Sequence, residues 1–305
     1  MSVYLIQVPA SSTNLGAGFD SLGLALGLYL KVKVRESAGS TTEIEMEGEG
    51  EKELVNISDN LIWNVIQRVF HGENKPLPTL HLTVHNSIPL ARGLGSSAAA
   101  IVAGLGSFEA LVGQELTQEK FFRYALEFEN HPDNITAARF GGFTISCISE
   151  KGEVCFSRTE ISHPLKLQAI VPDFQVATTK AREIIPQHVN INDVIFNLQR
   201  TALTVAALMG GQFQFMYESL RDRIHQPYRA SLIPGLEEIL RLNEKEVPDL
   251  LGVSLSGAGP SVLTFFRGNG QPIFQRIQAI FNGHGVVCRL VPLEIDNLGR
   301  SIHIS

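Results

Sequence analysis

The segment that most constrains this chain is rich in glycine and serine and runs directly into an apolar helical sequence: Pro89-Leu-Ala-Arg-Gly-Leu-Gly-Ser-Ser-Ala-Ala-Ala-Ile-Val-Ala103. Gly93 and Gly95 allow backbone torsions that other residues rarely adopt, so successive N–H groups can converge on an anion. We expect Ser96 or Ser97 to cap the helix that follows. The unpaired N–H groups of its first turn would then face a phosphate, so the segment predicts a phosphate-binding loop.

This loop differs from the common mononucleotide loop, which requires a lysine after its last glycine. No lysine occurs between Pro89 and Ala103, so a different nucleotide-binding fold is indicated. Glycine and serine before a helix can also form an ordinary connection, and an isolated Gly-x-Gly-Ser favours that interpretation. The full string is more specific than this isolated pattern.

Composition limits the classes of protein to which the chain can belong. It has 305 residues, of which 44% are apolar and 18% charged, as expected for one large or two ordinary globular domains. The net charge of −6 argues against nucleic acid as a partner. Three cysteines without metal-ligand spacing predict free thiols in a reducing compartment. The N-terminal sequence and the lack of a long apolar segment predict a cytoplasmic protein with no membrane partner.

A second unusual segment, Ala10 to Gly23, sets polar side chains among three glycines. It lies between a predicted strand at Val3 to Val8 and another at Leu28 to Arg35. Composition alone is compatible with a glycine-rich hairpin. The functional alternative is a substrate loop, in which Asn14 supplies a donor and an acceptor and Asp20 accepts from a hydroxyl or ammonium group.

A third polar group follows a helix that Thr117 is expected to cap: Glu129-Asn-His-Pro-Asp-Asn134. A histidine, two carboxylates and an asparagine lie within six positions, and the proline disfavours regular helix at His131. The residue types favour a polar helix end and a catalytic loop about equally.

The rest of the sequence predicts an α+β fold, because neither half alternates strands and helices regularly. We expect two domains, residues 1–158 and 159–305. The acidic segment from Glu36 to Leu54 is expected to be a solvated loop. The other predicted elements are helices at 58–70, 178–186, 192–210 and 272–281, and strands at 80–84, 143–147, 165–171, 175–178, 250–254, 262–266 and 286–290.

The string from Pro89 to Ala99 resembles the ATP-binding signature of the GHMP kinases: Pro, three variable residues, then Gly-Leu-Gly-Ser-Ser-Ala-Ala. The segments at 9–23, 127–134 and 225–235 resemble the forms found in the homoserine kinases of that family, and 255–263 resembles the third family motif. Ala17 replaces a common proline, and Asn130 replaces a glycine. The resemblance covers nearly the whole chain and implies a ribosomal-protein-like N-terminal domain with a ferredoxin-like C-terminal domain.

The resemblance also implies a reaction, the transfer of the ATP γ-phosphoryl group to the hydroxyl of L-homoserine in threonine biosynthesis, with magnesium as the metal. It assigns the carboxylate ligand of magnesium to Glu129, with Ser97 as its partner. The other implied site residues are, for ATP, Pro89, Leu90, Ala91, Arg92, Gly93, Leu94, Gly95, Ser96, Ser97, Ala98, Ala99 and Asn60; for the acceptor, Asn14, Asp20, His131, Arg182 and Arg229; for catalysis, Asn134, His131 and Asp133; and, as supports of the phosphate loop, Ser256, Gly257 and Gly259.

Two alternatives to this function are considered. The first is a GHMP kinase that acts on mevalonate, a sugar or shikimate. Arg182 and Arg229 favour an amino acid instead, because in the family they hold the acceptor carboxylate. The second is a sensor that kept the fold and lost the chemistry, against which the presence of Glu129, Ser97 and Asn134 argues. A homodimer is common in the family.

Overall fold

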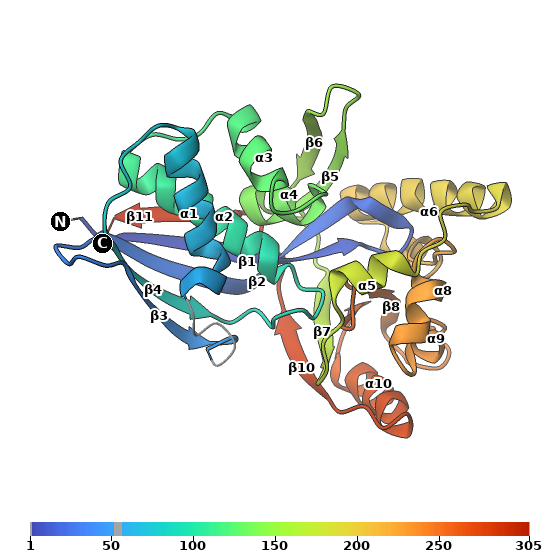
Figure 1. The fold of residues 1–305 in the computed structure, drawn as a ribbon. Coiled ribbons are helices and arrows are strands. Elements are labelled where there is room, and N and C mark those ends of the chain that lie inside the picture. Colours follow the sequence, from blue (N-terminus) through green and yellow to red (C-terminus); the bar gives the residue numbers. More distant parts are fainter. Residues whose placement is uncertain (1, 52–56, 305) are drawn as a thin grey trace.

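The computed structural model describes residues 2–51 and 57–304, which form two β-sheets with helices (Figure 1). In the described residues the first sheet has seven strands, in the order β11-β1-β2-β4-β3, with β5 paired to β2 and to β6. All its pairings are antiparallel except that of β3 with β4. The strands are β1 (Tyr4–Asn14), β2 (Gly18–Glu36), β3 (Glu43–Gly48), β4 (Leu80–Asn86), β5 (Phe143–Ile148), β6 (Val154–Thr159) and β11 (Ser301–Ile304).

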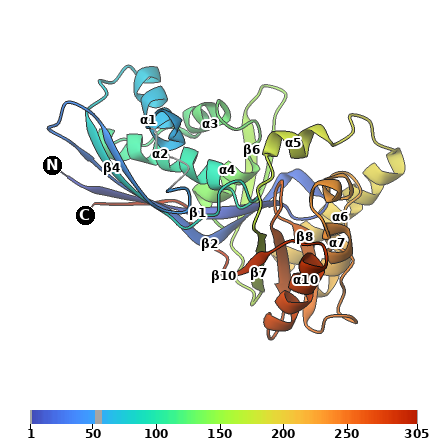
Figure 2. The same ribbon diagram turned by 60° about the horizontal axis from the view of Figure 1, so that its bottom comes forward.

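Four helices cover one face of this sheet: α1 (Leu61–Gly72), α2 (Ser96–Val112), α3 (Gln118–Leu126) and α4 (Asp133–Phe140) (Figure 2). The central helix α2 is rich in alanine and glycine and is buried along most of its length. At Gly104 an added Cβ would lie 2.7 Å from Val65 Cβ, so the glycine lets α1 and α2 pack closely. As predicted, Thr117 caps α3 by accepting a hydrogen bond from the Lys120 amide.

The second sheet has four strands in the order β10-β7-β9-β8, all antiparallel within the described residues. The chain order β7, helices, β8, β9, α10, β10 is the ferredoxin-like arrangement, which confirms the predicted fold. The strands are β7 (Lys166–Pro172), β8 (Leu250–Leu255), β9 (Val262–Phe266) and β10 (Cys288–Leu293). The helices are α5 (Thr178–Glu183), α6 (Ile191–Gly210), α7 (Met216–Ser219), α8 (Gln226–Arg229), α9 (Leu236–Ile239) and α10 (Gln271–Gly283), with single 3₁₀ turns at Ile57–Asp59, Phe213–Phe215 and Ala230–Leu232.

The β1–β2 hairpin connects the two halves. Its far end reaches past the first sheet toward α6 (Figure 1). There Thr201 Oγ1 donates to the carbonyl oxygen of Ala17 at 2.8 Å. Gly16 has a φ of +74°, and a Cβ at this position would overlap the backbone of Leu220. The turn of the hairpin is therefore fixed against the second half of the chain.

Several predicted boundaries were wrong. β1 continues through Pro9 to Asn14, and β2 begins at Gly18 instead of Leu28, because the two strands pair along the whole glycine-rich segment. Part of the expected loop from Glu36 to Leu54 is the strand β3, and residues 52–54 lie outside the described residues. The predicted strand at 175–178 does not form, since this stretch leads directly into α5.

The end of the chain returns to the first sheet, which the sequence did not predict. β11 pairs with β1, and both termini lie at the same end of the molecule (Figure 1). Arg300, just before β11, forms a buried ion pair with Glu109 of α2. The proposed division at 158/159 falls before the last residue of β6, seven residues ahead of β7. We keep this division as a proposal, with β11 added to the first domain.

Candidate active site

A cavity of about 320 Å³ lies where the hairpin, the phosphate loop and the second half of the chain meet. Its apolar part comes from β2, β3, β4, α1 and the segment before α2: Leu30, Met46, Leu61, Ile62, Val84 and Leu90. Its polar part comes from segments far apart in the sequence: Asn14, Asp20, Glu129, His131, Asp133, Asn134, Thr178, Arg182 and Arg229. An apolar region beside a cluster of charged groups is typical of a small-molecule site.

The phosphate loop enters α2 through Gly95, whose φ is +69°. This glycine is the N-cap, and no side chain caps the helix, so the predicted serine cap was wrong. The left-handed torsion of Gly95 ends the loop one residue earlier than expected, and Ser96 is already helical. The backbone N–H groups in the first turn of α2 are therefore left without a side-chain acceptor and can bind an anion. Ser96 and Ser97 line the cavity beside them.

Most of the residues predicted to bind ATP line the cavity, namely Asn60, 90–93 and 95–98. Pro89, Leu94 and Ala99 do not line it, and all three are buried. Asn60 also caps α1, because its Oδ1 accepts from the Trp63 amide at 3.2 Å. Arg92 points away toward the second sheet, where its Nε donates to the Pro172 carbonyl oxygen at 3.0 Å.

The third glycine motif holds the phosphate loop and the first hairpin together. Ser256 Oγ lies 2.6 Å from the Gly93 carbonyl oxygen and 2.8 Å from Ser12 Oγ. The Gly257 amide donates to the Thr13 carbonyl oxygen at 3.2 Å, while Gly259 donates back to Ser256. Ser256 is fully buried and outside the cavity wall, as a supporting residue should be.

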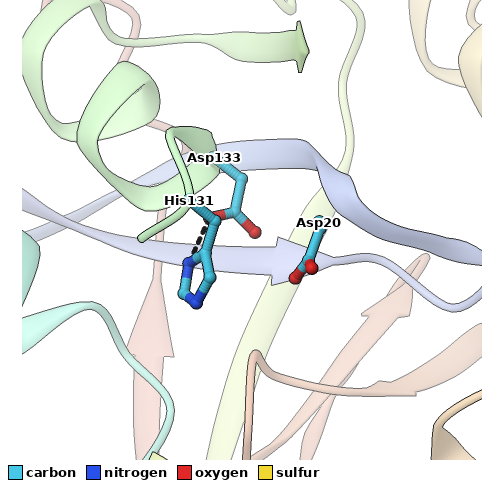
Figure 3. A group of neighbouring side chains, drawn as sticks. All are labelled: Asp20, His131 and Asp133. Carbon is cyan, nitrogen blue, oxygen red and sulfur yellow. Dashed lines mark ion pairs between the residues drawn. The ribbon is translucent and has the colours of Figure 1, made fainter. Parts of the chain in front are cut away.

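The loop before α4 brings three titratable groups together. His131 Nδ1 lies 3.3 Å from Asp133 Oδ1, and its Nε2 lies 3.5 Å from Glu129 Oε1. Asp20 faces them from β2 (Figure 3). Burial opposes protonation of the imidazole, but the adjacent carboxylate of Asp133, together with Glu129 and Asp20, raises the pKa of His131 above its usual value. The geometry therefore favours an imidazolium.

Two groups of residues can be compared as magnesium ligands. Ligand atoms of Asp20, His131 and Asp133 lie within 4.8 Å of one another, but magnesium prefers oxygen to imidazole. Glu129 and Ser97 offer a carboxylate and a hydroxyl on the wall that also carries the phosphate loop. Burial raises the pKa of Glu129, and Asp133 adds to this, although the charge of His131 opposes it; a cation beside Glu129 would favour its ionised form. Glu129 with Ser97 fits the chemistry of magnesium better.

Asn134 joins the same loop to β1. Its Oδ1 accepts from Ser11 Oγ at 2.8 Å, and its Nδ2 donates to Thr13 Oγ1 at 3.3 Å. Its backbone N–H donates to the buried Asp133 carboxylate at 2.8 Å. These contacts fix the amide on the cavity wall beside the phosphate loop.

The side chains of Asn14 and Asp20 differ in their hydrogen-bond partners. Asn14 Oδ1 accepts from the Asp20 amide and its Nδ2 donates to the Gly257 carbonyl oxygen, both at 3.0 Å. Both polar groups of this buried amide are thus used by the protein. Asn14 therefore holds Asp20 in place, and because its amide has a second N–H and a second lone pair and lines the cavity, contact with the substrate stays a prediction. The Asp20 carboxylate forms a two-bond ion pair with Arg182.

Arg229 is 2% exposed and reaches the cavity from α8. Its Nε donates to the Ala181 carbonyl oxygen at 3.1 Å and its Nη1 to that of Gly257 at 2.8 Å. Burial lowers the pKa of this guanidinium to about 10, although Asp20 opposes the shift. Within 2–51 and 57–304, Arg229 has no carboxylate at ion-pair distance, although such a partner is usual for a buried cation.

Sequence reasoning missed Phe19 and His225. The guanidinium carbons of Arg182 and Arg229 each lie 5.3 Å from the centre of the Phe19 ring. His225 stacks on this ring with the two centres 5.2 Å apart. Phe19 lies inside the first motif, between Gly18 and Asp20, so that motif could have indicated it. His225 begins the family-like segment 225–235, so that segment could have indicated it as well.

Comparisons with known proteins agree with this geometry. The model "GHMP kinases N terminal domain" matches residues 60–142, and "GHMP kinases C terminal" matches residues 205–283. A homoserine kinase of Solibacter usitatus is 41% identical over 285 residues, which cover 93% of this chain and 92% of the relative. One of Aquifex aeolicus is 39% identical, with 98% and 99% covered.

Solved structures share the fold. A crystal structure of homoserine kinase from Cytophaga hutchinsonii superposes with a TM-score of 0.85 at 24% identity, covering 99% of this chain and 97% of that one. A putative homoserine kinase from Listeria monocytogenes has a TM-score of 0.76 at 26% identity, covering 98% and 99%. In the described part of the chain, no helix has the length and apolarity needed to span a membrane. The chain belongs to the GHMP kinase family and, within it, to the homoserine kinases.

Proposed function

We propose that this chain transfers the γ-phosphoryl group of ATP to the hydroxyl oxygen of L-homoserine and so forms O-phospho-L-homoserine for threonine biosynthesis. The observation that carries this proposal is Arg229, a buried cation on the cavity wall without a carboxylate partner among the described residues. An anionic group of a small acceptor would compensate its charge. Mevalonate also has a carboxylate, but only an amino acid adds an ammonium group, which could donate to the remaining lone pairs of the Asp20 carboxylate beside its ion pair with Arg182.

ATP would place its base against the apolar wall near Asn60 and its phosphates at the N-terminus of α2. The uncapped first-turn N–H groups and the positive end of the helix dipole stabilise negative charge there. Glu129 and Ser97 would hold magnesium, which neutralises charge on the phosphate oxygens when bound.

The acceptor would bind between Asp20, Arg182 and Arg229. We assign its carboxylate to the two arginines and its ammonium group to Asp20. Arg182 already shares its guanidinium with Asp20, so it can contact the carboxylate while it stays oriented by this ion pair. The site thus pairs both charges of a zwitterion with groups of opposite sign.

Catalysis would depend on position and charge. A loose phosphoryl-transfer transition state carries its charge on the phosphoryl oxygens and needs no strong base. An imidazolium at His131, maintained by Asp133, would stabilise that charge, while Asn134 would orient the reacting groups. In this role His131 donates a hydrogen bond and does not take the hydroxyl proton, which would pass to an oxygen of the transferred phosphoryl group as the new O–P bond forms and the bond to ADP breaks.

A coupled ADP-release assay with L-homoserine, mevalonate, galactose and shikimate tests the substrate. We expect homoserine to have the highest kcat/KM by a wide margin. A higher kcat/KM for another acceptor would assign the chain to a different reaction. Tight ATP binding without ADP release for any acceptor would support the non-catalytic sensor.

We also propose a cytoplasmic location and a homodimer, the second on the family resemblance alone. All three cysteines are free thiols in the structure, with Cys147 and Cys155 exposed, which suits a reducing compartment. Light scattering coupled to size-exclusion chromatography tests the dimer, and a monomer at micromolar concentration would contradict it.

A further inference from the structure

His225 is a fully buried histidine one helical turn before Arg229, and the assigned chemistry does not use it. Its Nε2 lies 2.7 Å from the Gly16 carbonyl oxygen, at the turn of the first hairpin. Its Nδ1 lies 3.1 Å from Arg229 Nη1. The ring thus connects the turn of the substrate hairpin with the buried arginine.

These two contacts determine which ring nitrogen carries the proton. A carbonyl oxygen can only accept, so Nε2 must donate to Gly16. A guanidinium can only donate, so Nδ1 must be bare and accept from Arg229. His225 is therefore neutral, in the Nε2–H form. Burial and the charge of Arg229 lower its pKa, in agreement with the geometry, although Asp222 opposes them.

The ring is held from two further directions. Asp222 is buried, and its Oδ2 lies 3.5 Å from His225 Nε2, so it faces the same protonated nitrogen as the Gly16 carbonyl oxygen. Asp222 also accepts hydrogen bonds from the backbone N–H groups of residues 224–226 and from Asn197 of α6. Phe19 stacks on the other side at an interplanar angle of 22°. His225 therefore presents Nδ1 in one fixed position, because neither its backbone nor its ring is free to turn.

A neutral acceptor has a specific advantage at this position. A carboxylate there would fix Arg229 but would also cancel its positive charge, and so weaken its attraction for an anionic ligand. With His225, Ala181 and Gly257 as uncharged acceptors, Nε and Nη1 are fixed while the full charge is kept. Nη2 has no hydrogen-bond partner within the described ranges and is the part of Arg229 left for a ligand.

We propose that His225 is a positioning residue, which aims Arg229 at the carboxylate of the acceptor and transmits the position of the first hairpin to this arginine. The inference rests on the proposed role of Arg229 in binding that carboxylate. His225 acts through Arg229 and does not contact the acceptor itself.

The test compares kcat/KM for homoserine with kcat/KM for homoserine amide, in which a neutral amide replaces the carboxylate. His225→Phe keeps the ring and its stacking on Phe19 but removes both hydrogen bonds. We expect it to lower the homoserine-to-amide ratio by about tenfold to a hundredfold, since a hydrogen bond to a charged group is lost. KM for ATP should stay nearly unchanged. His225→Gln, which keeps one donor and one acceptor, should recover part of the ratio.

Two further variants separate this inference from the proposed function. Arg229→Met should lower the homoserine-to-amide ratio at least as much as His225→Phe does, with Arg182 retaining part of the preference, and an unchanged ratio would show that the proposed role of Arg229 is wrong. If Arg229→Met lowers the ratio while His225→Phe keeps the wild-type ratio, only the role of His225 is wrong. In the double variant His225→Phe should have no additional effect on the ratio, and a further loss would show that His225 acts independently of Arg229.

A measurement on the wild-type protein covers the case in which His225→Phe does not fold. The ¹⁵N shifts of the histidine rings distinguish the two neutral forms from the imidazolium. We expect the Nε2–H form at His225 at neutral pH, with and without homoserine. Detection of the Nδ1–H form or of the imidazolium would overturn the proposal.

Discussion

Arg182 and Asp20 form a two-bond ion pair that joins α5 to the first hairpin, with Nη2 2.7 Å from Oδ1 and Nη1 2.9 Å from Oδ2. Their side chains are 42% and 33% exposed, respectively. Pairs at this level of exposure are screened by water and contribute little to stability. We therefore expect this pair to contribute more to the proposed binding of the acceptor than to the stability of the fold.

Arg182→Met should for this reason separate activity from stability. We expect kcat/KM for homoserine to fall by at least about tenfold, because a charge-assisted bond to the acceptor carboxylate is lost. The free energy of unfolding should change by no more than about 1 kcal/mol. Steady-state kinetics and urea denaturation measure the two effects. Normal turnover of homoserine by a folded variant would contradict the assignment.

Arg229→Met should reduce both properties. Arg229 is buried, and its removal leaves two buried acceptors without their donor, the carbonyl oxygen of Ala181 and Nδ1 of His225, whereas the Gly257 carbonyl oxygen keeps its bond from Asn14 Nδ2. Each unsatisfied buried acceptor costs about 1 to 3 kcal/mol, so we expect the free energy of unfolding to fall by at least about 2 kcal/mol. Activity toward homoserine should fall as in Arg182→Met. If urea denaturation shows equal stabilities for the two variants, the contacts described for Arg229 do not hold.

Two glycines at opposite ends of α2 provide a matched pair of variants. Gly95 and Gly113 have φ values of +69° and +71°, so alanine strains the backbone equally at both. A Cβ at Gly113 meets no atom within 4 Å, whereas at Gly95 it would overlap Ser11 Oγ and lie 3.0 Å from Asn134 Oδ1. Gly113→Ala should cost about 1 kcal/mol and keep activity.

Gly95→Ala should be the more destabilising change and should also reduce kcat, because it disrupts the bond between Ser11 and Asn134. Thermal unfolding and initial rates of both variants check this. Equal losses of stability and activity would mean that Gly95 matters only through its backbone torsion.

Glu129→Gln tests the proposed magnesium ligand. The amide keeps the shape of the side chain but removes the negative charge, so we expect half-saturation by magnesium to require at least about tenfold more metal. Glu127→Gln is the control, because Glu127 forms a partly exposed ion pair with Arg68 and does not line the cavity. Magnesium titrations of ADP release should distinguish the two variants. An identical dependence on magnesium in both would place the metal elsewhere.

The reactivity of the three cysteine thiols tests the fold without any measurement of activity. Cys147 and Cys155 are exposed, whereas burial raises the pKa of the Cys288 thiol to about 11. A raised pKa favours the neutral thiol, so at pH 8 roughly one Cys288 in a thousand is a thiolate. In the native protein a disulfide reagent should modify two thiols rapidly and the third only after unfolding. Equal reaction rates for all three would contradict the packing around β10.

Local features were predicted well from the sequence. Capping of α3 by Thr117, the long helix α6 and the strands of the second sheet follow from periodicity and residue type within a few positions. The wrong boundaries involve long-range pairing. β11 is only four residues long, and its partner β1 lies almost a whole chain length away. No local pattern shows that such a partner exists.

The same limit applies to the site. Sequence motifs indicated which residue types gather at the cavity, but not which of their polar groups the protein itself uses. Asn14 has both groups occupied by Asp20 and Gly257, and Asp20 is paired with Arg182, which lies 162 positions away. His225 gains its role only from contacts with Gly16 and Arg229 in the folded chain.

The most direct test of the central claim identifies the product. ³¹P NMR of a reaction with ATP, magnesium and L-homoserine should show a phosphomonoester signal that is split by two methylene protons and grows in step with ADP. That splitting places the phosphoryl group on the hydroxyl oxygen of homoserine. ADP accompanied only by inorganic phosphate, or a phosphoryl group on any other atom of homoserine, would contradict the account.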